Sequence, residues 1–241
     1  DQLNRDIPLS AFVQTLRDLM GQLLSETDSA IAQWRSKILD AVGENGQLLI
    51  EVIPELEHII GQQPAVPELS GTAAENRFNR LLQNFIGVFT APQHPLTIIL
   101  DDLQWADSAS LQLTHQLALE TKHLLLLGAY RDNEISPGHG LPLMIDTLEK
   151  ANVTVNTITL APLTLDDTNQ LVADALQGSK AVAKPLTELL LRKTKGNPFF
   201  TVQFLKSLHE AGHITFDPTQ GHWQCDIAQV STLALTDDVV A

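Results

Sequence analysis

The sequence predicts an α/β fold in which a parallel sheet is followed by a helical lid and the start of a winged-helix unit. Three short apolar runs, at 96–100, 123–130 and 153–160, have the continuous character of strands that are buried on both faces. Helical stretches at 108–120 and 141–151 separate these runs, and strands that alternate with helices are typical of a parallel sheet. Further along the chain the pattern becomes helical.

The elements on both sides of the predicted sheet follow from helical spacing and from turn residues. Apolar residues recur at helical spacing in four stretches before the sheet. These helices are expected at 9–24, 29–42, 47–60 and 72–90, with Pro54 able to kink the third. Three more helices are expected at 166–177, 183–194 and 198–211, and two hairpin strands at 213–217 and 222–226.

The net charge and the cysteine content indicate which binding partners and which cellular location to expect. The chain has 241 residues, of which 29 are acidic and 15 are basic, for a net charge of −14. A field of this sign repels nucleic-acid phosphates and anionic lipids, so we expect neither nucleic acid nor a membrane as partner. Cys225 cannot form an internal disulfide, and no run has the composition of a targeting signal or a membrane span. These features predict a cytoplasmic location.

Two adjacent carboxylates give the sharpest chemical signal. Asp101 and Asp102 follow directly on the apolar run 96–100, in the segment LTIILDDLQWADSASLQL. The C-terminal end of a parallel strand points into the ligand crevice of an α/β sheet. There one carboxylate can hold the Mg²⁺ of a nucleoside triphosphate, and the second can orient or deprotonate the attacking water. The alternative is structural: the pair ends a strand, and Asp107 or Ser108 caps the next helix.

The residues after the acidic pair carry a family resemblance. An apolar strand, an acidic pair and a Trp-Ala-Asp tripeptide occur in this order, so the segment resembles the Walker B motif of AAA-like signalling ATPases of the STAND class. The resemblance implies a P-loop NTPase sheet with residues 96–102 as its Walker B segment. It further implies ATP and Mg²⁺ as cofactors, Asp101 as the metal ligand and Asp102 as the catalytic residue that positions water.

Arg131 follows the second apolar run, in the segment LLLLGAYRDNE. In a parallel sheet this end faces the same crevice as Asp101, where a guanidinium could contact the γ-phosphate through charge-assisted hydrogen bonds. The alternative is a surface arginine that pairs with Asp132 or Glu134. The resemblance implies the first role, because 123–131 corresponds to the sensor strand of the family. Arg131 is then a catalytic and a nucleotide-binding candidate.

A Gly-Asn-Pro element lies between two of the later helices, in LLLRKTKGNPFFTVQFLKSL. Gly196 can end one helix in a left-handed conformation, Asn197 can cap the next helix, and Pro198 suits its first turn. These roles explain the element in full. It also resembles a lid-domain element of the same ATPases, which implies that Asn197 and Pro198 bind the nucleotide near its base. The two roles are compatible.

The chain contains no G-x-x-x-x-G-K-[ST] sequence, the loop that grips the β- and γ-phosphates. In the family this loop and the first strands lie upstream of the equivalent of Asp1, so we expect an incomplete sheet and no ATP hydrolysis by these residues alone. We expect residues 1–162 to be the C-terminal part of the NTPase core and 163–211 to be a helical lid. Residues 212–241 would then start a winged-helix-like unit.

The resemblance is closest to the ATPase module of large bacterial proteins that join a serine/threonine kinase, this ATPase, sensory domains and a two-component histidine kinase. It implies an ATP-binding and ATP-hydrolysing regulatory switch. The expected partners are the flanking kinase and sensor domains of the same polypeptide, with self-association as a further expectation. Two alternatives stay open: a non-hydrolysing protein-interaction scaffold, and the ATPase module of a STAND-type transcription regulator.

Overall fold

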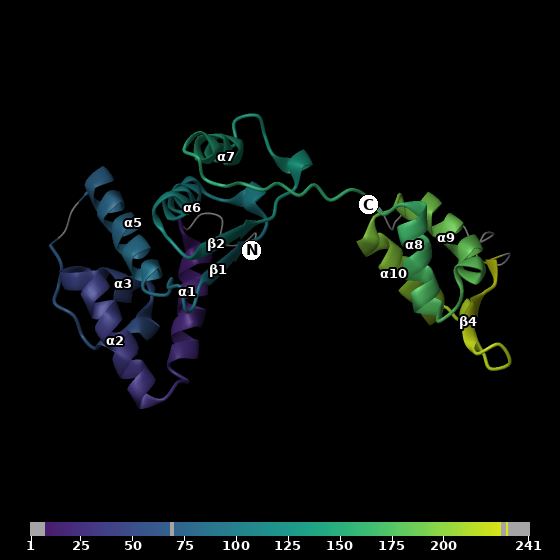
Figure 1. Ribbon diagram of the computed structural model, residues 1–241, viewed down its shortest axis with the longest axis horizontal. Coiled ribbons are helices and arrows are strands. Elements are labelled where there is room, and N and C mark those ends of the chain that lie inside the picture. The colour runs from purple at the N-terminus through teal and green to yellow at the C-terminus, as the bar shows by residue number, and fades with distance from the viewer. Residues whose placement is uncertain (1–7, 68–69, 228–229, 231–241) are drawn as a thin grey trace. The chain divides into compact units, whose positions relative to one another are not determined.

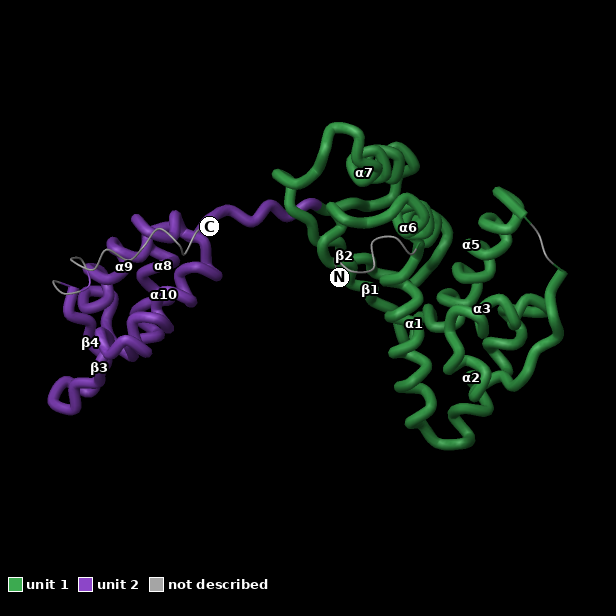
Figure 2. The backbone as a smooth tube through the Cα atoms, turned by 180° about the vertical axis from the view of Figure 1, so that it is seen from behind, with its two compact units in different colours: residues 1–156 green, residues 157–241 purple. Residues whose placement is uncertain are grey.

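The computed structural model describes residues 8–67, 70–227 and 230 (Figure 1). The chain divides into two compact units, residues 1–156 and residues 157–241 (Figure 2). Each unit has its own core of buried apolar side chains. Within the described ranges, none of the helices combines the length and the apolar composition that a membrane span needs.

Unit 1 begins with a group of helices that pack around one core. They are α1 (Ser10–Leu23), α2 (Asp28–Val42), the 3-10 turn η2 (Gly43–Asn45), α3 (Gly46–Val52), the 3-10 turn η3 (Pro54–Leu56), α4 (Glu57–Ile60) and α5 (Thr72–Gly87). Met20, Ile38 and Phe85 are fully buried where these helices meet. The helix predicted at 47–60 is broken into three pieces, because Pro54 has no N–H with which to continue α3.

Two parallel strands form the sheet of unit 1. β1 (Leu96–Leu100) and β2 (Leu124–Gly128) pair in register, with Leu100 opposite Gly128. The crossover between them is α6 (Ser108–Glu120). The structure thus confirms two of the predicted strands and their parallel pairing, and it places the carboxyl ends of both strands at the same edge.

One face of this sheet is packed and the other is open. Ile98 of β1 lies in the helical core with Leu113 and Leu117 of α6. Side chains alternate along a strand, so Ile99 and Leu125 point to the opposite face, where Ile99 is 71% exposed. The sequence predicted strands that are buried on both faces. That expectation is wrong for the described residues, since no element of unit 1 covers the second face.

A further helix of unit 1 supports the end of the sheet. α7 (Gly140–Lys150) packs against α6 through Leu141 and Leu111. Leu103, in the loop after β1, belongs to the same apolar cluster. The loop that carries the acidic pair therefore rests on packed helices.

The third predicted strand, at 153–160, does not form. This segment contains neither helix nor strand, and Ile158 and Leu160 are 83% and 89% exposed. A strand needs a neighbour for its backbone N–H and C=O groups, and the parallel sheet of the described residues contains only β1 and β2. The run has the apolar, β-branched composition of a strand, but it pairs with no strand of the described residues.

The elements described for unit 2 are a group of three helices and a β-hairpin. These are α8 (Leu165–Leu176), α9 (Lys180–Thr194), α10 (Pro198–Glu210), β3 (Ile214–Asp217) and β4 (His222–Cys225), with the two strands antiparallel. They confirm the predicted helices and hairpin. Ile214 and Trp223 of the hairpin pack into the same core as Leu190 and Phe204 of the helices. The division into a lid and a winged-helix-like unit stays a prediction.

Candidate functional site

The loop that follows β1 is fastened to the end of β2. The Leu103 N–H donates to the Ala129 carbonyl oxygen at 2.9 Å, and the Ala129 N–H donates to the Leu100 carbonyl oxygen at 2.9 Å. Gly128 leaves room for this approach, because a Cβ there would lie 2.6 Å from Cδ1 of Leu103. Residues that follow the two strands are therefore held close together at one edge of the sheet.

Asp101 and Asp102 lie in this loop, and one oxygen of each carboxylate accepts a hydrogen bond from within the loop. The backbone of Asp102 is left-handed, with φ of 55°, a conformation that aspartate tolerates better than most residues. Its N–H donates to Oδ1 of Asp101 at 2.9 Å, and its own Oδ1 accepts a hydrogen bond from Nε2 of Gln104 at 2.8 Å. Asp101 is exposed and Asp102 is half-buried. Among the described residues, neither Oδ2 atom has a hydrogen-bond partner, so each carboxylate keeps one oxygen for a ligand.

Gln104 joins the two strand ends. It lies in the 3-10 turn Leu103–Trp105 and is only 5% exposed. Its Nε2 donates to Asp102, while its Oε1 accepts the backbone N–H of Arg131 at 3.1 Å. The acidic pair and Arg131 therefore meet at one edge, as the parallel topology predicted.

The side chain of Arg131 has local partners. Its Nη1 donates to Oε1 of Glu134 at 2.8 Å, and its guanidinium lies 6.0 Å from the ring centre of Trp105. The hydrogen bond to Glu134 and the charge of Glu134 raise the pKa of Arg131 above its ordinary value, and the charges of Asp102 and Asp101 add to the effect. This is the surface pairing that the structural alternative named. Contact with a γ-phosphate stays a prediction.

The Gly-Asn-Pro element of unit 2 forms the capped turn that its residue types predict. Gly196 has φ of 78°, and its carbonyl oxygen accepts the Leu163 N–H at 2.8 Å. Oδ1 of Asn197 accepts the Phe200 N–H at 3.2 Å, and Pro198 is the first residue of α10. The capping role of Asn197 and the place of Pro198 are confirmed. The left-handed residue that ends α9 is Lys195, with φ of 54°, and Gly196 follows it, also with positive φ. Contact between this turn and a nucleotide is untested, because Asn197 and Pro198 belong to the other unit.

The acidic edge has the donor chemistry that suits magnesium. Mg²⁺ prefers oxygen ligands and takes one or two carboxylates, together with water and phosphate oxygens, in nucleotide sites. Asp101 and Asp102 supply carboxylates of this kind. In the part of the chain that the structure describes, no group of three or more His, Cys, Asp or Glu side chains could hold a metal. The residues therefore fit a metal whose other ligands come from water and a nucleotide.

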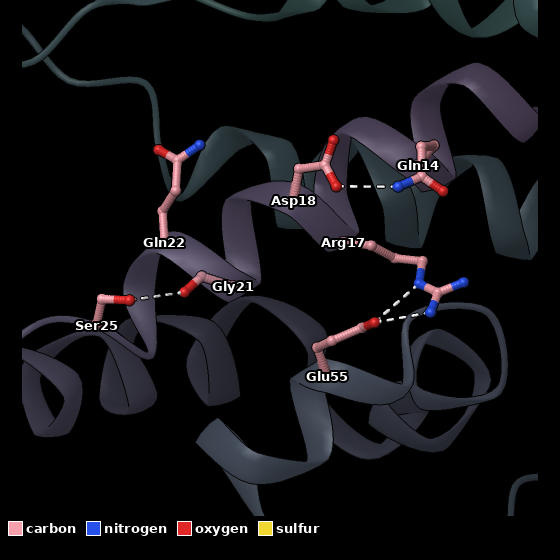
Figure 3. Close-up of a pocket in the computed structure, with 7 residues that line it drawn as sticks. All are labelled: Gln14, Arg17, Asp18, Gly21, Gln22, Ser25 and Glu55. Carbon is pink, nitrogen blue, oxygen red and sulfur yellow. Dashed lines mark hydrogen bonds and ion pairs between the residues drawn. The ribbon is translucent and has the colours of Figure 1, made fainter.

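A groove along α1 lies in the same unit but contains none of the predicted site residues. Polar side chains of α1 and Glu55 line it (Figure 3). Nη2 of Arg17 lies 2.7 Å from Oε1 of Glu55, and this hydrogen bond raises the pKa of Arg17 and lowers that of Glu55. The ion pair ties α1 to the 3-10 turn Pro54–Leu56, so its role is structural.

The described sheet of unit 1 is parallel, with an acidic pair after one strand and an arginine after the next. The model of the AAA ATPase domain family matches residues 1–127, and the chain belongs to this family. It is similar to the hybrid signal transduction histidine kinase G of Dictyostelium discoideum, with 25% identity over 306 aligned residues. The match covers 100% of this chain and 9% of that protein. No solved structure matched the chain.

Proposed function

We propose that these residues form the regulatory switch module of a larger signalling protein, a module that binds ATP and Mg²⁺ and hydrolyses the ATP. One observation carries the proposal: in a member of the AAA ATPase family, the acidic pair after β1 and Arg131 after β2 lie at one edge of a parallel sheet. The similarity to a hybrid signal transduction histidine kinase supports the signalling context.

Each residue at this edge has a role that its contacts allow. Bound Mg²⁺ supplies charge neutralisation at the β- and γ-phosphates. Asp101, the more exposed carboxylate, holds the metal, and the half-buried Asp102 orients the attacking water. Arg131 exchanges its exposed contact with Glu134 for the γ-phosphate, which costs little because exposed ion pairs contribute little to stability.

The helices and hairpin of unit 2 complete the switch as its lid and the start of a winged-helix-like unit. We propose that Asn197 and Pro198 lie near the base of the nucleotide, and that nucleotide binding changes the position of the lid relative to the core. A linked kinase or sensor domain in the same polypeptide then responds to that change. The family membership and the signalling relative support this proposal.

Turnover of Mg-ATP in the natural full-length polypeptide tests the roles of the acidic pair. We expect Asp101→Ala and Asp102→Asn each to lower the rate by about 10²- to 10³-fold, the usual effect of removing a group that acts on developing charge. The matched control is Asp146→Asn, which removes a carboxylate that is 50% exposed and pairs with Lys150 on α7.

The outcomes separate the proposal from its alternatives. A loss of turnover in both pair variants, with the control unchanged, supports the switch. Equal turnover in all three variants rejects the assignment of the pair. Nucleotide binding without turnover in the unsubstituted polypeptide favours the non-hydrolysing scaffold.

A further inference from the structure

Gln104 is a buried polar side chain whose two amide atoms are both used. Burying an amide without hydrogen bonds costs about 1–3 kcal/mol in proteins, so its partners are necessary for its position. Both partners come from the acidic edge: the Asp102 carboxylate on one side and the Arg131 backbone N–H on the other. These two hydrogen bonds explain why a buried polar residue lies between Leu103 and Trp105.

The polarity of these partners selects a primary amide. An ionised carboxylate only accepts hydrogen bonds, and a backbone N–H only donates. Gln104 must therefore direct its NH₂ group to Asp102 and its carbonyl oxygen to Arg131, which also settles the orientation of the amide. Glutamate lacks the donor, lysine lacks the acceptor and leucine lacks both.

The link spans 27 positions of sequence and two strands. Gln104 follows β1, whereas Arg131 follows β2. The two backbone hydrogen bonds of Leu103 and Ala129 fasten the same strand ends. These backbone bonds do not involve the Asp102 carboxylate, whose Oδ1 is held by the side chain of Gln104.

We propose that Gln104 is a positioning residue, which holds the Asp102 carboxylate and the Arg131 backbone in the one relative placement that serves catalysis. This inference rests on the proposed function, because it assigns Gln104 to the same nucleotide site. Gln104 touches neither substrate nor metal. It acts through the two residues that do, as partners of metal-site ligands commonly act.

Two substitutions in the natural full-length polypeptide separate the two hydrogen bonds. Gln104→Leu removes both, while Gln104→Glu keeps an acceptor for the Arg131 N–H and replaces the donor to Asp102 with a like charge. Gln112→Leu is the control, because Gln112 is an exposed glutamine on α6 in the same unit.

The first readout is structural and does not depend on turnover. Hydrogen–deuterium exchange of peptides that cover 129–134 reports the Arg131 amide. We expect exchange about fivefold faster in Gln104→Leu, the factor for one lost hydrogen bond of about 1 kcal/mol, and unchanged in Gln104→Glu and the control. Unchanged exchange across α6 in each variant shows that unit 1 remains folded.

The second readout is the steady-state rate of ATP hydrolysis. We expect kcat to fall about 10- to 100-fold in both Gln104 variants, with KM for ATP changed less than about threefold. A merely structural role would leave kcat of the folded Gln104→Glu polypeptide unchanged, and that result overturns the inference. So does unchanged exchange of the Arg131 amide in Gln104→Leu.

Failure of this inference differs from failure of the proposed function. If the Asp101 and Asp102 variants lose turnover while the Gln104 variants keep it, only the positioning role is wrong. If the aspartate variants keep turnover, the proposed function is wrong, and the positioning role falls with it whatever the exchange experiment shows.

Discussion

The loop after β1 and the turn between α9 and α10 both combine loop chemistry with a predicted nucleotide contact. In the turn, the Gly196 backbone approaches Leu163, and Oδ1 of Asn197 caps α10. In the loop, Asp101 and Asp102 each retain an oxygen without a hydrogen-bond partner among the described residues.

This difference predicts different consequences of substitution. A residue whose polar groups are all used by the fold contributes mainly to stability, and its replacement lowers the free energy of unfolding. A residue whose polar atoms remain uncommitted contributes little to stability and is available for chemistry. Substitutions in the turn should therefore affect stability first, and those in the loop should affect turnover first.

The largest expected effect on stability comes from Gly196→Ala. A Cβ at this position would lie 2.5 Å from the Leu163 carbonyl oxygen, and φ of 78° is unfavourable for alanine. We expect unit 2 to lose about 2–4 kcal/mol of unfolding free energy, from the strain and the overlap together. Gly212→Ala is the control, since φ there is 75° and no atom lies within 4 Å of its Cβ. Equal losses in urea denaturation would show that the contact with Leu163 is unimportant.

Arg131→Ala, in unit 1, is expected to lower turnover while leaving stability almost unchanged. We expect turnover in the natural full-length polypeptide to fall by at least about tenfold, because a charge-assisted contact is worth about 1.5–3 kcal/mol. The free energy of unfolding should change little, since the pair with Glu134 is exposed. Glu134→Gln removes the same ion pair and leaves Arg131 available, so it should retain turnover. An equal loss of turnover in Arg131→Ala and Glu134→Gln would contradict the sensor role of Arg131.

Asn197→Ala should have a smaller effect on stability. Loss of the cap on α10 is expected to cost about 1 kcal/mol, and Asn197→Asp should restore most of it. Thermal unfolding of the three proteins measures this difference. If Asn197→Asp restores stability while nucleotide affinity stays low, the side-chain amide has a second role in binding.

The smallest expected effect is a pH dependence of unit 2. Asp167 accepts hydrogen bonds from the Thr164 hydroxyl and backbone N–H in a capping box at the start of α8, and these bonds hold its pKa below the ordinary value of 3.8. A lowered folded-state pKa means that this stabilisation is complete above about pH 4 and is lost as the pH falls through the folded value. Urea midpoints between pH 5 and pH 2 check this. Asp167→Asn should reduce the slope in this range.

The sequence predicted the parts of the fold that depend on local pattern. The strands 96–100 and 124–128, the helices around them and the capping roles of Asn197 and Pro198 all follow from apolar spacing and turn chemistry. The strand at 153–160 fails because a strand requires a neighbour, and pairing is a tertiary property that a local pattern cannot supply.

The candidate site shows the same limit. Parallel topology was sufficient to predict that Asp101, Asp102 and Arg131 share an edge. It did not indicate Gln104, because the hydrogen bond to the Arg131 N–H joins residues that follow two different strands. Within its own segment, Gln104 is one polar residue between Leu103 and Trp105, and nothing local distinguishes it from an exposed glutamine.

In the proposed site, the Asp101 carboxylate holds the metal of a bound nucleotide. Electron paramagnetic resonance tests this metal-binding role directly. Mn²⁺, a spectroscopic substitute for Mg²⁺, is titrated into the natural full-length polypeptide in the presence of ATP. We expect Asp101→Asn to weaken metal binding in the ternary complex at least about tenfold, since one charged oxygen ligand is lost. Equal affinity in the Asp101→Asn variant and the unsubstituted protein would contradict it.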